Sequence, residues 1–169
     1  GGVIFSNYGN KISKAYITYE IYTNGNPSIT MVDLNGNKIS GLYKNVNVAT
    51  GEWVHLSFVI SGNECSCYVD GKLKETKTFN VPYESHIPVH KFGVGGDART
   101  DNSQNFKGEI ADIAIYGDAR TALEVASDYA SNEIDKPLFL DTIILNVLIF
   151  TLVFTSLNFT VINLLPTFL

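Results

Sequence analysis

The stretch that decides the fold begins with Trp53-Val54-His55-Leu56-Ser57-Phe58-Val59-Ile60. It continues with Cys65-Ser66-Cys67-Tyr68-Val69-Asp70-Gly71 and ends with Phe106-Lys107-Gly108-Glu109-Ile110-Ala111-Asp112-Ile113-Ala114-Ile115-Tyr116. Apolar residues at every second position from Val54 to Ile60 predict a strand with one buried face. Asp70-Gly71 predicts a tight hairpin turn, because both positions tolerate positive φ. Residues 109–116 predict a last strand after the glycine-rich loop 93–96. Together these runs indicate an antiparallel sheet.

Shorter strand patterns extend outward from this stretch in both directions. Turn signals at Asn24-Gly25, Asn35-Gly36 and Gly62-Asn63 separate them at the intervals typical of all-β proteins. A predicted helix covers 122–131, where Thr121 and Glu124 fit a capping box. The pattern predicts an antiparallel β-sandwich (jelly roll) with one short C-terminal helix. The other predicted strands are 2–6, 15–22, 28–34, 38–43, 73–79 and 92–95.

The charge distribution separates a globular part of the chain from an apolar tail. The 169 residues carry a net charge of −5, which argues against nucleic acid because phosphate binding needs a basic face. All Lys and Arg residues lie before residue 138, and Asp141 is the only charged residue after it. We therefore divide the chain into a domain at 1–131, a linker at 132–141 and an apolar segment at 142–165.

Four motifs resemble, in order and spacing, the laminin G-like and pentraxin-like domains of the concanavalin A-like lectin/glucanase superfamily. Trp53-Val54-His55-Leu56-Ser57 is similar to their Trp-x-His strand, and Tyr68-Val69-Asp70-Gly71 to their strand ending in Tyr-Val-Asp-Gly. Phe106-Lys107-Gly108-Glu109-Ile110 resembles the start of their last strand, and Ala122-Leu123 lies in a capped helix like the one that closes these domains. The resemblance implies an extracellular module for recognition or cell adhesion that binds glycan or protein ligands.

The chain also departs from these domains in two places. They usually show Asp-Glu where this chain has Ala111-Asp112, and they open with strands before the one predicted at 2–6. We therefore expect an N-terminally truncated sandwich with an exposed sheet edge or core face. Such a chain, expressed without its tail, is expected to aggregate.

Both cysteines are predicted to fill the core. Cys65 and Cys67 lie on one face of a strand, with their Cα atoms roughly 6.5–7 Å apart at a rise of about 3.3 Å per residue. Their parallel Cβ vectors disfavour a disulfide, and a metal site would need further ligands. A metal, or partners lost with the N-terminus, are the alternatives.

No pair of carboxylates fits the needs of glycan hydrolysis. A retaining hydrolase places two carboxyl groups about 5–5.5 Å apart across the bond. Glu109 and Asp112 are three residues apart, so they would face opposite sides of a strand. We therefore predict that the chain is not an enzyme. A glycoside hydrolase-related enzyme of the same fold and a structural interaction module within a larger chain are the alternatives.

A polar loop at 97–105 is the predicted ligand site. Its carboxylate and amide oxygens are donors that Ca²⁺ coordinates, and the resembled domains often hold Ca²⁺ at one rim of the sandwich. Against a cation stand Arg99 and the fact that solvated loops share this composition. We predict ligand binding by the loop residues, with Asp97 and Asp101 as metal ligands if Ca²⁺ binds. The predicted ligand-binding residues are Asp97, Asp101, Asn102 and Asn105.

Tyrosines are the other candidate ligand contacts. Tyr16, Tyr19, Tyr22 and Tyr43 could stack on sugar rings, although such residues more often fill the core or pair across strands. The sequence leaves open which of their faces meets solvent.

The apolar segment at 142–165 is long enough to span a bilayer as a helix. A lipid-anchor signal following Ala130-Ser131-Asn132, extra strands or a helix packed on the domain, and an accidental extension are the alternatives. The lack of period-two alternation disfavours packing as strands. The leading prediction is therefore a recognition module at the cell surface, tethered to the membrane by its C-terminus.

Overall fold

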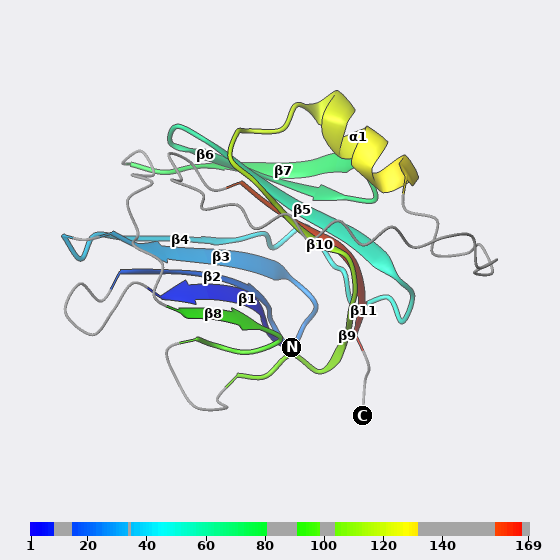
Figure 1. The fold of residues 1–169 in the computed structure, drawn as a ribbon, viewed down its shortest axis with the longest axis horizontal. Coiled ribbons are helices and arrows are strands. Elements are labelled where there is room, and N and C mark those ends of the chain that lie inside the picture. Colours follow the sequence, from blue (N-terminus) through cyan, green and yellow to red (C-terminus); the bar gives the residue numbers. More distant parts are fainter. Residues whose placement is uncertain (9–14, 34, 81–90, 99–103, 132–157, 167–169) are drawn as a thin grey trace, which may run out of the picture.

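Two antiparallel β-sheets face each other, and a helix lies on the outer side of one of them (Figure 1). This computed structural model describes residues 1–8, 15–33, 35–80, 91–98, 104–131 and 158–166. The first sheet, sheet A, has the strand order β4-β3-β2-β1-β8, and the second, sheet B, has the order β10-β11-β5-β6-β7 with β9 also beside β11. The predicted antiparallel β-sandwich with a short helix is confirmed.

Sheet A is built from the N-terminal third of the chain and one later strand. Its β2, β3 and β4 follow one another through short turns, as the turn signals predict, and β8 pairs with the free side of β1. The strands are β1 (Gly2–Tyr8), β2 (Tyr16–Ile21), β3 (Pro27–Val32), β4 (Lys38–Leu42) and β8 (Lys91–Val94).

Sheet B contains the motif strands of the central stretch. Asp70 and Gly71, with φ angles of 51° and 70°, form the predicted tight turn between β6 and β7. The lysine-rich β7 forms one edge of the sheet, as its polar sequence predicts. The strands are β5 (Val54–Ser61), β6 (Glu64–Val69), β7 (Lys72–Thr78), β9 (Gly108–Ile110), β10 (Ile113–Tyr116) and β11 (Asn158–Pro166).

Aromatic rings from both sheets meet in the core. The ring of Phe58 on β5 lies 5.1 Å from that of Tyr19 on β2 and 5.6 Å from that of Tyr43, measured between centroids. Cys65 and Cys67 are buried free thiols in the same cluster, which confirms that they fill the core. Tyr19 and Tyr43 are therefore core residues, whereas Tyr22 is exposed.

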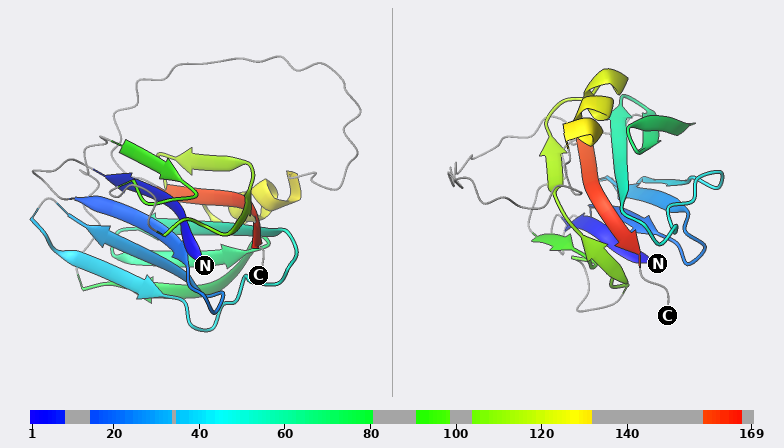
Figure 2. Two further views of the ribbon diagram at one scale, coloured as in Figure 1. Left: turned by 90° about the horizontal axis from the view of Figure 1, so that it is seen from below. Right: turned by 90° about the vertical axis from the view of Figure 1, so that its right-hand side faces the viewer.

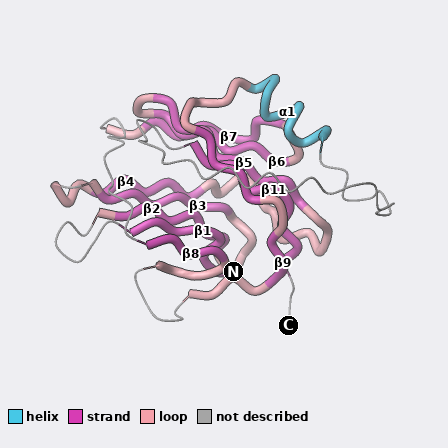
Figure 3. Tube along the Cα trace, in the orientation of Figure 1, coloured by secondary structure: helices cyan, strands magenta, loops and turns pink. Residues whose placement is uncertain are grey.

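The helix α1 (Ala122–Ser131) covers the outer side of sheet B (Figure 3). Its Val125 packs with Val59 and Tyr68, which explains why the outward face of β5 is buried as well as its inward face. The predicted capping box is present: Glu124 Oε2 accepts a hydrogen bond from the Thr121 N–H at 2.8 Å, and Thr121 Oγ1 accepts one from the Glu124 N–H at 3.2 Å.

The predicted last strand, 109–116, is two strands rather than one. Asp112 has a φ of 52°, a left-handed conformation that separates β9 from β10, and each of these two strands pairs with β11. The prediction of one continuous strand is wrong at this position.

The end of the chain forms a strand within sheet B. Figure 2 shows β11, in red, running between β5 and the β9–β10 segment. Residues 158–166 form a strand here, residues 142–157 lie outside the described part of the chain, and the membrane segment predicted at 142–165 stays a prediction. In the parts of the chain that the structure describes, no helix is long and apolar enough to cross a membrane.

Candidate ligand-binding groove at Trp53

We compare two hollows on the described surface, which share no lining residue. The first, which we call the Trp53 groove, has a volume of about 510 Å³. The second, the rim hollow, has a volume of about 500 Å³ and lies along β8 and the start of the loop that follows it. The Trp53 groove is lined by Asn45, Val46, Asn47, Thr50, Glu52, Trp53, Val54, Val69, Asp70 and Lys74. The rim hollow is lined by Phe92, Gly93, Val94, Gly95, Gly96, Asp97, Ala98, Asn105 and Phe106.

One wall of the Trp53 groove is the connection between β4 and β5, residues 43–53. The amide of Asn26 donates hydrogen bonds to the carbonyls of Val46 and Lys44, and the Val48 N–H donates to the Gly25 carbonyl at 2.9 Å. Gly25 has a φ of 83°, and a Cβ atom there would lie 2.4 Å from the Asn47 Oδ1. These contacts hold the backbone of the wall against the β2–β3 turn.

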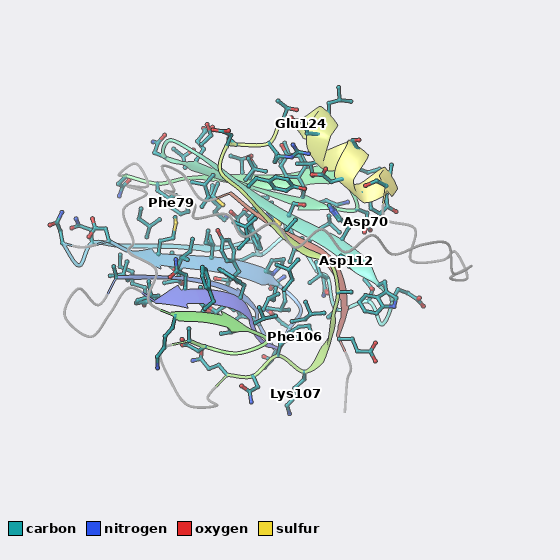
Figure 4. All side chains as sticks on the ribbon, in the orientation of Figure 1. Asp70, Phe79, Phe106, Lys107, Asp112 and Glu124 are labelled. Atoms are coloured by element: carbon teal, nitrogen blue, oxygen red, sulfur yellow. The ribbon has the colours of Figure 1, made fainter. Side chains whose placement is uncertain are left out.

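The opposite wall is the β6–β7 hairpin. The Asp70 N–H donates to the His55 carbonyl at 2.8 Å, and Asp70 Oδ1 accepts from the His55 N–H at 3.1 Å. Helix α1 supports the hairpin from behind, since a Cβ atom on Gly71 would lie 3.1 Å from the Cα of Ala126. Asp70 accordingly lies at the α1 end of sheet B (Figure 4).

The groove combines an apolar floor with polar groups at its rim. Its floor consists of the buried valines Val46, Val54 and Val69. The side chains of Asn45, Glu52 and Lys74 are exposed and form no hydrogen bond with a described residue, so they are available to a ligand. The half-buried Trp53 adds an aromatic surface beside them.

Behind the groove, His55 lies under α1 with 1% of its surface exposed. Its ring centroid is 5.6 Å from that of Tyr129, and neither ring nitrogen has a hydrogen-bond partner among the described residues. Burial lowers the pKa of His55, while the carboxylates of Asp128 and Asp70 act in the opposite direction. A neutral His55 is therefore part of the packing that supports the hairpin wall.

The rim hollow contains two of the four predicted ligand residues. The Ser6 hydroxyl donates to the Gly96 carbonyl at 3.1 Å and accepts from the Ala98 N–H at 2.6 Å, which fixes the backbone on both sides of Asp97. Asp97 and Asn105 line the same hollow, although only 6% of Asp97 is exposed.

The other two predicted ligand residues, Asp101 and Asn102, lie outside the described residues. Among the residues that the structure does describe, no three His, Cys, Asp or Glu side chains cluster in a way that could hold a metal. The calcium site therefore stays a prediction.

A family model described as the concanavalin A-like lectin/glucanases superfamily, of laminin G type, matches residues 1–126, well over half of the chain. The chain belongs to this superfamily. No curated protein and no solved structure matches it. Membership in the superfamily indicates a carbohydrate- or protein-binding module, and it agrees with the resemblance that the strand motifs of the sequence carry.

Sequence reasoning missed the Trp53 groove in this superfamily domain. A signal was present: polar residues Asn45, Asn47, Thr50 and Glu52 immediately precede the chain's single Trp. The missing information was the second wall, because Asp70 and Lys74 approach this segment only through the pairing of β5 with β6 and of β6 with β7.

Proposed function

We propose that the chain is a non-catalytic recognition domain that binds glycans in the Trp53 groove. The observation that carries this proposal is the rigid groove in which an aromatic side chain lies beside exposed carboxylate, amide and ammonium groups over an apolar floor. Sugar hydroxyls both donate and accept hydrogen bonds. They can donate to the Glu52 carboxylate, accept from the Lys74 ammonium group, and do either with the Asn45 amide. The C–H face of a pyranose ring suits the indole face of Trp53.

The size of the groove favours a glycan over a folded protein as its ligand. A volume of about 510 Å³ falls in the range of roughly 300–1,000 Å³ that is typical of small-ligand sites. A stable protein interface buries about 800 Å² on each partner, which requires a broad surface rather than a groove.

The proposal contains no catalytic step. Glu52 and Asp70 stand on opposite walls of the groove, which keeps a glycoside hydrolase-related enzyme as the second candidate. Asp70, however, already accepts a hydrogen bond from the His55 N–H and holds the hairpin turn, so its carboxylate serves the fold. Release of reducing sugar from a bound glycan, lost in Glu52→Gln, would instead establish the enzyme.

The test is a glycan array probed with the full chain, with and without Ca²⁺. Trp53→Ala is expected to weaken binding at least tenfold, because it removes the aromatic surface. Leu123→Ala is the matched control, since Leu123 is an exposed apolar residue on α1, 81% exposed and outside both hollows. Binding that survives Trp53→Ala but is lost in Asp97→Asn or on removal of Ca²⁺ would place the site in the rim hollow instead.

Tethering at the cell surface through residues 142–165 is a separate part of the proposal. A helix that spans a bilayer needs about 20 residues, and residues 142–157 alone are too few. Tethering therefore requires residues 158–165 to leave sheet B. Flotation of the full chain with liposomes tests this: co-flotation that resists high salt supports the tether, and a chain that stays at the bottom of the gradient contradicts it.

A further inference from the structure

A strand from the far end of the chain closes sheet B. Among the described strands, β5 and β10 do not pair with each other, and each pairs antiparallel with β11 instead. The short strand β9 pairs with β11 as well. We call the space between β5 and the β9–β10 segment the acceptor slot. Without β11, both sides of this slot would present unpaired backbone N–H and C=O groups.

The register of β11 matches both sides of the slot. Val161 stands opposite Leu56 on β5 and Ile113 on β10, and Leu56 is fully buried in the core. The preceding residue, Thr160, stands opposite Ser57, which belongs to the outward face of β5. A slip by one residue would exchange the two faces, so the pairing of residues 159–161 with β5 favours this register, which then shifts at an irregularity between Val161 and Leu164.

The connection to β11 is long enough to let the strand reach other slots. Residues 132–157 join the end of α1 to the start of β11. A chain of this length extends to on the order of 80 Å, whereas a domain of this size has a radius of gyration of about 15 Å. By length alone, the connection would let β11 reach the slot of a second chain.

We propose that the acceptor slot also accepts residues 158–166 of a second copy of the chain, which produces a strand-exchanged dimer. Each slot then holds the same strand in the same register as in the single chain, and exchange of an identical element requires no new interface. The share of dimer rises with protein concentration. This inference is independent of glycan binding, because β11 lines neither hollow.

The test uses two full-length variants, Ser57→Cys and Thr160→Cys, refolded together from denaturant and then oxidised. Directly opposed residues on antiparallel strands have Cα atoms about 4.5–5.5 Å apart, which falls within the disulfide range of about 4.4–6.8 Å. A disulfide that joins position 57 of one variant to position 160 of the other reports that the strand of one copy fills the slot of the other. The native Cys65 and Cys67 are buried and present in every variant, so any cross-linking through them is the same background in all samples.

The matched control replaces Thr160→Cys with Leu165→Cys, since Leu165 stands opposite Glu109 at the other end of the slot. At least tenfold more heterodimer is expected with Thr160→Cys than with this control. The double variant Ser57→Cys/Thr160→Cys then separates the remaining outcomes. The double variant could cross-link within one chain while the mixture of single variants gives no heterodimer. This result would show that the slot accepts only the strand of its own chain, and it would overturn the proposal.

Absence of both products would show that β11 does not occupy the slot, which also overturns the proposal. If Ser57→Cys does not fold, Ala114→Cys replaces it, because Ala114 on β10 also stands opposite Thr160. Far-UV circular dichroism of each variant establishes whether it folds.

Discussion

At the residue scale, His55 shows how a side chain outside the groove can control it. The ring of His55 is buried beneath α1, and the backbone N–H of His55 donates a hydrogen bond that holds Asp70 in the hairpin wall. Charging the ring would place an ion between the helix and the sheet with no hydrogen-bond partner among the described residues. The protonation state of His55 is therefore linked to the docking of α1.

This linkage predicts a dependence of stability on pH. Burial lowers the pKa of His55 in the folded chain below the value of about 6.5 in the unfolded chain. Near that pH the unfolded chain binds more protons, so the free energy of unfolding falls as the pH decreases below about 6.5. The melting temperature of the wild type is expected to drop more between pH 8 and pH 5 than that of His55→Gln. Parallel melting curves for the two proteins would contradict this prediction.

At the element scale, β11 has the largest consequence for the sandwich. Three strands pair with it, so its loss opens two edges of sheet B. Exposed edges of this kind are templates for aggregation. Loss of β11 is therefore a second reason to expect aggregation of a chain without its tail, separate from the N-terminal strands that the resemblance implies are missing.

Val161→Pro tests that cause within the full-length chain. Proline removes a backbone N–H in the middle of a paired strand, so a hydrogen bond of the ladder is lost. We expect a lower melting temperature and increased light scattering on warming. Thr160→Val is the control, because it keeps the backbone hydrogen bonds and a β-branched side chain. A Val161→Pro chain that melts like the wild type would show that β11 does not stabilise the sheet.

At the scale of the whole molecule, the two thiols report on the integrity of the core. Burial raises the pKa of Cys65 to about 12, and burial also raises the pKa of Cys67. The native thiols should therefore be unreactive toward a disulfide reagent at pH 8 and should react together when the domain unfolds. The measurement is the labelling rate across a denaturant titration. Rapid labelling of either thiol without denaturant would contradict a closed core.

Much of the fold follows from short-range patterns in the sequence. Alternation from Val54 to Ile60 identifies β5, Asp70-Gly71 identifies a turn, and Thr121 with Glu124 identifies the start of α1. Each of these features depends on residues within a few positions of one another, so local stereochemistry is sufficient to predict it. The interruption at Asp112 escaped prediction, because positive φ is uncommon for a residue other than glycine and depends on its surroundings.

Apart from β11 and the break between β9 and β10, the sequence by itself determined the strands, together with the turns, the helix cap, the buried cysteines and the superfamily. Only the tertiary structure decided that both faces of β5 are buried, that residues 158–166 complete sheet B, and that Trp53 faces a groove shared with Asp70 and Lys74. The physical reason is the separation in sequence of the residues involved. These three features arise where segments distant in sequence meet, and a pattern of period two carries no information about which distant segment will cover a face or fill an edge.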